Sequence, residues 1–409
     1  MYLYLSGRRE ENQEDAVVEV AIASTPRSLP LPAADDGGSA IASDFMMPFV
    51  TRYGFPDLDQ VILPSEEYTS CWDSRTRNAR WVVERINLNT VSGPGDRKKS
   101  PFRPDSRLHP LFSSSLSDFQ GSGYDRGHLA PAGDHKTTQA NLKQTFLLSN
   151  MAPQVPSFNR GYWNDFEEFV RTLVVPSERS IKAAADEGLP APLPFKDVYV
   201  ITGPLFLPSK EPPAPVTSNG TTIDVGRRGD VASIPEDPPV KWVVKHDIIG
   251  SPMQMVAVPT HFFKVIVAEP YPPPPSEALY SPPTTYVAAF AMPNTSIPNN
   301  TDLRNFLVPL EVLESVSGMR FLGAGADTKA SRGLLDEDAK VSLDQEALRV
   351  RKKAGVPALP GWGKGGDSMK GGDGKRFYIA AGKGSVETTA GEKRRLFRHL
   401  CTKTSCRGL

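Results

Sequence analysis

The sequence predicts an α+β protein with a central antiparallel sheet flanked by helices. Three apolar runs are rich in β-branched and aromatic residues and bounded by Pro or Gly, which is typical of strands: DVYVITGPLF, QMVAVPTHFFKVIVAE and TTYVAAFAMPN, beginning at residues 197, 254 and 284. Helical and strand patterns do not alternate regularly along the chain. This irregularity excludes a parallel, doubly wound sheet, in which strands and helices follow one another in turn.

Three further segments complete the predicted elements. The run RNARWVVERI predicts a core strand that follows a turn, and Phe146–Leu148 predicts a short strand that ends at Ser149 and Asn150. The segment FNRGYWNDFEEFVRTLVV predicts one amphipathic helix that begins near Asn159. Its apolar residues recur at helical spacing, at Tyr162, Trp163, Phe166, Phe169 and Val170.

The 409-residue chain is long enough for two or three average domains, or for one large domain with insertions. Residues 1–45 carry three Arg against eight Asp and Glu, and we expect this acidic segment to be disordered. The patterned part is interrupted by polar or Pro-rich insertions. The expected organisation is a domain over 46–322 with insertions near 208–236 and 270–283, a low-complexity basic insert or linker over 323–392, and a closing segment over 393–409.

Charge, cysteine content and hydropathy limit the possible partners. The net charge is zero, but residues 324–409 carry eighteen Lys and Arg against ten Asp and Glu. A basic tail suits an anionic partner, although a solvated tail explains the same bias. Three cysteines are too few for a disulfide scaffold, and the C-terminal C-x4-C pair has no second Cys or His pair to complete a zinc site. No apolar run approaches the roughly 18 residues of a membrane helix, so we expect no transmembrane segment.

The stretch GSGYDRGHLAPAGDHK, residues 121–136, contains the side chains best suited to catalysis. His128 can act as a general base because an imidazole titrates near neutral pH. Arg126 can hold a phosphate with its planar set of donors, and Gly127 allows a tight turn or the close approach of a substrate. Hydrolysis of a phosphodiester needs such groups together with a cation. On this stretch alone, a histidine in an ordinary surface loop is an equally good interpretation.

A second pair of candidates lies downstream. Asn159 and Glu167 are eight residues apart, which places them about 80° apart around one helix. An amide oxygen completed by waters is a weak site that suits Mg²⁺, because this ion keeps most of its hydration shell. Glu167 can accept a hydrogen bond from one of those waters. Taken alone, Asn159 is better explained as a helix N-cap.

Together these segments resemble the DNA/RNA non-specific endonucleases of the ββα-metal (His-Me finger) class, and especially its mitochondrial members. The resemblance is carried by YDRGHLAPAGDH, FLLSNMAPQVPSFNRGYW and NDFEEF. It implies a ββα-metal nuclease fold for residues 46–322. Six blocks occur there in the family's order: RYGFPDL, SRTRNARWVVERI, GSGYDRGHLAPA, VYVITGPLFLP, VAVPTHFFKV and NFLVPLEVLESVSG.

The resemblance also implies roles for individual residues. His128 matches the general base, Asn159 matches the single protein ligand of the metal, and Glu167 matches the acid that orients water. Asn150 matches the asparagine that helps to position the site, and Arg126 matches the arginine beside the scissile phosphate. Asp125 would then be structural, fixing the loop that aims the base.

One further arginine is left open by the resemblance. In this family an upstream arginine contacts the substrate, and in GDRKKSPFRPD it is either Arg97 or Arg103. The implied activity is Mg²⁺-dependent cleavage of DNA and RNA to 5′-phosphate and 3′-hydroxyl ends, with Mn²⁺ as the alternative ion. A homodimer is also implied. A mitochondrial location is implied by the resemblance alone, because a transit peptide is Arg-rich and acid-poor and residues 1–45 are neither.

Two other functions compete with this interpretation. One is an exonuclease-preferring enzyme of the same fold, which would leave a closed circular plasmid intact. The other is a catalytically inactive nucleic-acid-binding protein on the nuclease fold. The presence of His128, Asn150, Asn159 and Glu167 together argues against an inactive protein, because a site that no longer works has no reason to keep all four.

Overall fold

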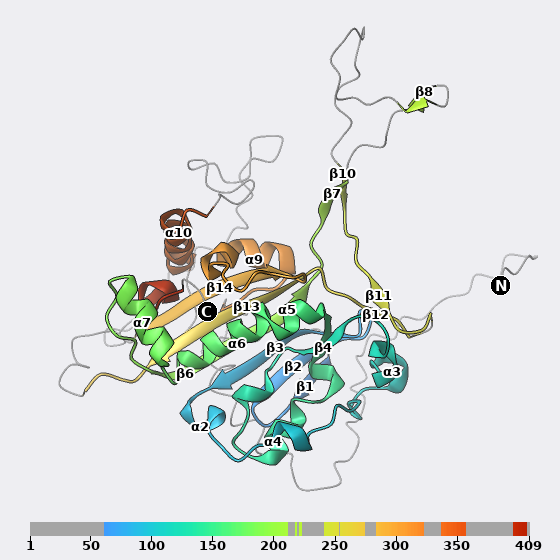
Figure 1. The fold of residues 1–409 in the computed structure, drawn as a ribbon, viewed down its shortest axis with the longest axis horizontal. Coiled ribbons are helices and arrows are strands. Elements are labelled where there is room, and N and C mark those ends of the chain that lie inside the picture. Colours follow the sequence, from blue (N-terminus) through green and yellow to red (C-terminus); the bar gives the residue numbers. More distant parts are fainter. Residues whose placement is uncertain are drawn as a thin grey trace, which may run out of the picture. The chain divides into compact units, whose positions relative to one another are not determined.

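One mixed sheet of eight strands organises the described part of the chain in the computed structural model (Figure 1). The structure describes residues 61–211, 217–218, 221–222, 241–252, 254–274, 284–322, 337–356 and 396–406. Seven strands follow the order β1-β2-β3-β6-β13-β14-β15 in antiparallel pairs, and β16 pairs in parallel with β14. Their bounds are Val61–Pro64, Tyr68–Asp73, Asn78–Ile86, Phe195–Leu205, His261–Pro270, Thr284–Pro293 and Leu307–Val308 in that order, with β16 at Leu396–His399. The predicted α+β class is confirmed.

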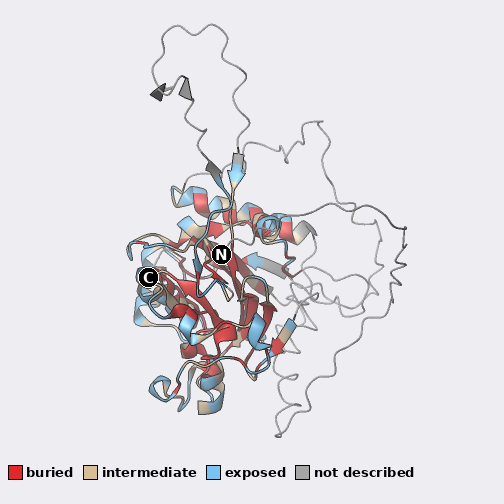
Figure 2. Cartoon of the chain, turned by 90° about the vertical axis from the view of Figure 1, so that its right-hand side faces the viewer, coloured by how far each residue is buried: buried red, intermediate tan, exposed pale blue. Residues whose placement is uncertain are grey.

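The central strands β3, β6 and β13 are buried on both faces of the sheet. Successive side chains of a strand point to opposite faces. In β6, Val198 and Val200 therefore join one hydrophobic core, while Tyr199 and Ile201 join a second. Figure 2 shows the buried residues in red, concentrated in the strands. Both faces consequently need a cover of helices.

The first face is covered by α5 (Pro156–Arg160) and α6 (Tyr162–Thr172). Their aromatic side chains pack against strand β13, and the ring of Trp163 lies 5.6 Å from that of Phe262. The buried residues of α6 are those of the predicted apolar face, so the amphipathic pattern is confirmed. This packing fixes the polar edge of α6 beside the sheet.

The second face is covered by α9 (Leu310–Ser317) and α10 (Glu337–Lys353). Leu313 of α9 and Leu343 of α10 belong to the second core. Helix α10 lies within the segment 323–392, of which the structure describes only residues 337–356. That part of the expected basic insert is therefore a helix packed on the sheet.

The expectation of one continuous helix from Asn159 onward is wrong. The chain forms α5 and then α6, with a break at Gly161. A Cβ at Gly161 would lie 2.6 Å from the carbonyl oxygen of Ser157, so only glycine fits this turn. Asn159 is in the last turn of α5, whose N-cap is Val155. The N-cap role for Asn159 is therefore wrong as well.

The predicted strand at Phe146–Leu148 is also wrong. The chain instead forms a 3₁₀ turn, η4 (Leu148–Asn150), followed by strand β5 (Met151–Gln154). Strand β5 pairs with β4 (Asp125–His128) in a separate two-stranded sheet. Short apolar runs do not distinguish a strand from a buried turn by periodicity. Here the buried Asn150 side chain stabilises the turn, because it bonds to the backbone of Ala130 and to that of Thr145.

Several expected segments lie largely outside the described residues. All of the acidic segment 1–45 lies outside them. The same holds for most of 208–236, for most of 355–376, and for residues 275–283 of the second insertion. At the base of the first insertion, β7 (Ser209–Glu211) pairs with β10 (Lys241–Val243). In the closing segment Cys401 and Cys406 form a disulfide. None of the described helices is both long and apolar enough to cross a membrane.

Candidate active site

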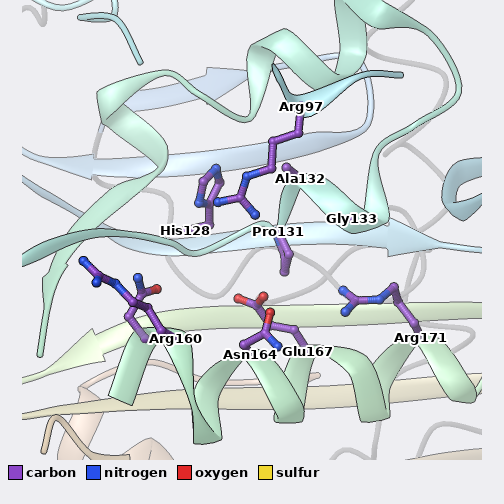
Figure 3. Close-up of a pocket in the computed structure, with 10 residues that line it drawn as sticks. Arg97, His128, Pro131, Ala132, Gly133, Arg160, Asn164, Glu167 and Arg171 are labelled. Carbon is purple, nitrogen blue, oxygen red and sulfur yellow. The ribbon is translucent and has the colours of Figure 1, made fainter. Parts of the chain in front are cut away.

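A polar cleft of about 320 Å³ lies between the first layer of helices and the loop that follows β4. Figure 3 shows His128 and Arg97 pointing into it from one side, and Asn164 and Glu167 pointing into it from α6. The cleft thus joins residues from three separate stretches of sequence, at 97, 128–133 and 159–171. It is lined by Arg97, His128, Pro131, Ala132, Gly133, Asn159, Arg160, Asn164, Glu167 and Arg171.

His128 ends strand β4 and is buried, with 7% of its surface exposed. Its ring packs edge-on against Phe146 at 5.0 Å and lies 5.7 Å from Phe102. Among the described residues its Nε2 atom has no hydrogen-bond partner. Burial lowers the pKa of His128 to about 3, and the positive charge of Arg97 acts in the same direction. The imidazole is therefore neutral at pH 7 and can accept a proton.

The amide of Asn159 is oriented by Asp125. Its Nδ2 atom donates to Asp125 Oδ2 at 2.9 Å, and Arg160 bonds both oxygens of the same carboxylate, at 2.7 and 2.6 Å. Burial tends to raise the pKa of Asp125, but the bonds from Arg160 and Asn159 outweigh it and hold that pKa below its usual range. With the amide nitrogen engaged, the amide oxygen of Asn159 is left to act as an acceptor in the cleft.

This arrangement fits a hard divalent cation. Amide and carboxylate oxygens suit Mg²⁺, which also keeps several waters. Asn159 supplies the neutral oxygen, and the Glu167 carboxyl lines the same cleft. Among the described residues no three His, Cys, Asp or Glu side chains cluster as a metal site. A site with one amide ligand would not form such a cluster.

Glu167 is half-buried on α6, and its charge depends on its neighbours. Burial raises its pKa to about 8, while Lys264 acts to lower it, Asp134 to raise it and Arg171 to lower it. Lys264 comes from the centre of β13, is 1% exposed, and donates to Thr202 Oγ1 at 2.8 Å. The buried ammonium group of Lys264 therefore acts on the Glu167 carboxyl from within the sheet. Any cation bound in the cleft would favour the charged carboxylate further.

Of the three predicted arginines, only Arg97 lines the cleft. Arg97 lines it, whereas Arg103 does not and donates to the Lys143 carbonyl at 3.0 Å. Arg126 stacks on Phe102, with its guanidinium carbon 4.6 Å from the ring centre, and lines a neighbouring hollow.

Asn150 and Gly127 support the strands that carry His128. Asn150 is fully buried, accepts from Ala130 N, and donates to the carbonyls of Ala130 and Thr145, each at 2.9 Å. It thereby fixes the chain just after His128. Gly127 does not form a turn; it lies within β4, where a Cβ would overlap the side chain of Gln154.

Comparison with known proteins agrees with this geometry. Residues 49–328 match the family model of the DNA/RNA non-specific endonucleases. The human protein "Endonuclease G, mitochondrial" is 36% identical over 67% of this chain and 73% of its own. The protein "Mitochondrial nuclease" of Saccharomyces cerevisiae is 38% identical over 76% of this chain and 80% of its own. A crystal structure of the EndoG/EndoGI complex contains a chain with 34% identity and a TM-score of 0.51, covering 70% of this chain and 93% of that one.

This chain belongs to the DNA/RNA non-specific endonuclease family. The expected ββα-metal fold is confirmed, with β4, β5 and α5 as its compact unit. The family is metal-dependent. The human and yeast relatives are mitochondrial proteins, as is "Nuclease 1, mitochondrial" of Schizosaccharomyces pombe, which is 38% identical over 70% of this chain and 74% of its own.

Sequence reasoning missed several residues at the site of this endonuclease. Arg160, Asn164 and Arg171 line the cleft, and the two arginines lie on the side opposite His128, where each is paired with a carboxylate. Their signal is weak because charged residues are common on a helix surface. Lys264 had a clearer signal, because it is the one charge in the apolar run HFFKVIV.

The second histidine of the motif, His135, has surroundings that suit a structural role. His135 is fully buried, with Nδ1 3.1 Å from a carboxylate oxygen of Glu67 and Nε2 2.8 Å from one of Glu84. Burial acts to lower the pKa of His135, but the two carboxylates outweigh it and raise that pKa to about 10. His135 is therefore a buried cation that ties the loop after β4 to the sheet.

Proposed function

We propose that this protein is a Mg²⁺-dependent endonuclease that hydrolyses DNA and RNA to 5′-phosphate and 3′-hydroxyl ends. One observation carries the proposal. A buried, neutral imidazole with an unengaged Nε2 atom, that of His128, shares a polar cleft with the oriented amide of Asn159. A proton acceptor and a cation ligand in one cleft are what metal-assisted phosphodiester hydrolysis requires.

His128 acts as the general base in the proposed reaction. It takes a proton from a water molecule whose oxygen attacks phosphorus, the P–O3′ bond breaks in line, and the departing 3′-oxygen takes a proton from a second water molecule. His128 then returns its proton to the solvent, which restores the base. The positive charge of Arg97 lowers the pKa of His128. An anionic phosphate bound in the cleft offsets this charge and therefore raises that pKa toward the working pH. The base thus becomes stronger when substrate is bound.

The other side chains bind and orient. Asn159 would hold the cation through its amide oxygen, and Asp125 keeps that oxygen turned toward the cleft. Bound Mg²⁺ would supply a Lewis acid that stabilises negative charge on the phosphoryl group and the leaving oxygen. Glu167 would accept a hydrogen bond from water near the ion. Arg97 is the better candidate for the upstream substrate contact, because it lines the cleft and Arg103 does not.

Substrate range, assembly and location are part of the same proposal. The side chains of the cleft suit phosphate and sugar, contacts that carry little sequence information. Action on both DNA and RNA follows, with Mn²⁺ as the alternative ion. We also propose a homodimer and a mitochondrial location, in line with the mitochondrial relatives.

A plasmid and an RNA, each incubated with Mg²⁺ and with EDTA, test the activity. We expect Mg²⁺-dependent nicking of closed circular DNA and degradation of RNA, both lost in His128→Ala. An exonuclease-preferring enzyme would leave the closed circle intact while degrading linear DNA. An inactive binding protein would bind the plasmid and the RNA without cutting either.

A further inference from the structure

A second hollow, of about 630 Å³, lies beside the catalytic cleft. It follows the chain from the segment before α3 (Leu116–Phe119) to the start of β4. We call it the side groove; among the residues that line it are Phe102, Leu116, Phe119, Gln120, Tyr124 and Arg126. The reaction proposed above assigns no step to any of these residues, although the family resemblance matches Arg126 to the arginine beside the scissile phosphate.

Three aromatic side chains, those of Phe102, Phe119 and Tyr124, line the side groove, and contacts with the rest of the chain hold them in place. Tyr124 donates from its hydroxyl to Asp247 Oδ2 at 2.5 Å, which fixes its ring. Phe119 is 4% exposed and belongs to a small core with partly buried Phe102 and Tyr124. The guanidinium of Arg126 stacks on Phe102, and its Nε is buried with no hydrogen-bond partner in the described chain. A flat aromatic ring entering this groove would meet both aromatic and cationic surfaces.

The side groove is connected to the catalytic cleft through one side chain. Asp125 lines the groove, and its carboxylate bonds Asn159 and Arg160, which line the cleft. Asp125 thus separates the two hollows, and a base in the groove would belong to a nucleotide next to the scissile phosphate in the cleft. The exposed amide of Gln120 lies at the rim, where it can meet the polar edge of a base.

We propose that the side groove takes an unstacked nucleobase of the strand being cut, next to the scissile phosphate. The proposal rests on the proposed nuclease function. Aromatic surfaces stack on any base, so this contact adds affinity without sequence preference. In a duplex the base must first leave its stack, which opposes binding. The substrate class is therefore a single-stranded or locally melted strand, in preference to a rigid duplex.

A strand that lacks one base tests the proposal on the native protein. An end-labelled single-stranded DNA with one abasic residue is cut briefly with Mg²⁺, and cleavage at each linkage is compared with that at distant linkages of the same strand. We expect cleavage at one linkage flanking the abasic residue to fall about 5- to 150-fold, the range lost with one base–aromatic stack. A flat profile across the abasic residue overturns the proposal.

A matched pair of variants locates the effect. Tyr124→Leu removes the ring and should abolish the dip beside the abasic residue, whereas Tyr124→Phe keeps the ring and should retain it. A dip that is unchanged in Tyr124→Leu places the base elsewhere and overturns the proposal. Failure of the nuclease function is distinguishable, because it would show as no Mg²⁺-dependent cleavage at any linkage and would overturn both proposals together.

Discussion

His128 and His135 lie seven residues apart in one motif and are both buried, but His128 is neutral at pH 7 whereas His135 is positively charged. His128 has aromatic neighbours and an Nε2 atom with no partner in the described chain, and burial lowers its pKa to about 3. His135 has a carboxylate on each ring nitrogen, and these raise its pKa to about 10. Burial by itself favours the neutral imidazole in both cases. The hydrogen-bond partners, and not the depth of burial, therefore separate a base from a structural cation.

The largest expected difference between the two histidines is in catalysis. His128→Ala should reduce single-turnover cleavage by about 10²- to 10⁴-fold, the usual contribution of a general base. Nucleic-acid binding should persist because other residues contact the phosphate. Rates on a labelled oligonucleotide and anisotropy in EDTA measure the two effects. Near-normal cleavage by the variant would exclude the assigned role.

A change to the support of Asn159 should have the next largest effect. Asp125→Asn removes the carboxylate that holds the Asn159 amide and Arg160. Outer partners of a metal ligand typically contribute 10–100-fold to metal affinity or activity. We expect the Mg²⁺ concentration for half-maximal cleavage to rise by about that factor, with a smaller loss of rate at saturating Mg²⁺. Asn159→Ala is the matched control and should not be rescued by Mg²⁺. Equal Mg²⁺ dependence in Asp125→Asn and the native protein would contradict the orienting role.

His135 should instead determine stability. His135→Gln leaves Glu67 and Glu84 without their buried cation, and removing one partner of a buried pair typically costs about 3–5 kcal/mol. Urea unfolding measures this loss at neutral pH. If the loss is real, His135→Gln combined with Glu84→Gln should be more stable than His135→Gln alone, since the double variant contains one buried charge fewer. A double variant that is no more stable would show that the charges do not interact in this way.

The pH dependence of folding should also follow His135. Its folded pKa of about 10 lies above the ordinary value of 6.5, so its contribution is complete below pH 6.5 and is lost as pH rises through 10. The difference in free energy of unfolding between the native protein and His135→Gln should therefore shrink between pH 7 and pH 10. A difference that stays constant over that range would mean that the imidazole is neutral when folded.

Much of the fold around the two histidines could be predicted from the sequence, but the difference between their charges could not. The motif, the strands β6, β13 and β14, and the apolar face of α6 follow from patterns within one segment. The partners of His135 come from Glu67 and Glu84, 68 and 51 residues upstream, and no local pattern connects them. The break at Gly161 is local by contrast, because the carbonyl that leaves room only for glycine belongs to Ser157, four residues earlier; the apolar pattern continues across it and does not reveal it.

The choice between Arg97 and Arg103 shows the same limit within the active site. Both arginines lie in one basic run, and the sequence left the choice open. The structure places Arg97 in the cleft and turns Arg103 to the Lys143 carbonyl. The difference arises from the short helix η1 (Arg97–Lys99), which is capped by Asp96 and docked on Gln139. Long-range docking of this kind cannot be read from spacing.

The smallest expected effect is on the proton affinity of His128. After burial, the positive charge of Arg97 is the next cause of its lowered pKa. Arg97→Gln should therefore raise that pKa and shift the acidic limb of the rate–pH profile toward higher pH. The loss of one phosphate contact should also reduce the slope of log affinity against log salt by about 0.9 on duplex DNA. Arg103→Gln, the matched control, should leave the acidic limb in place because Arg103 does not line the cleft. Equal shifts in both variants would mean that the overall charge of the basic run, and not Arg97 in the cleft, determines the base strength of His128.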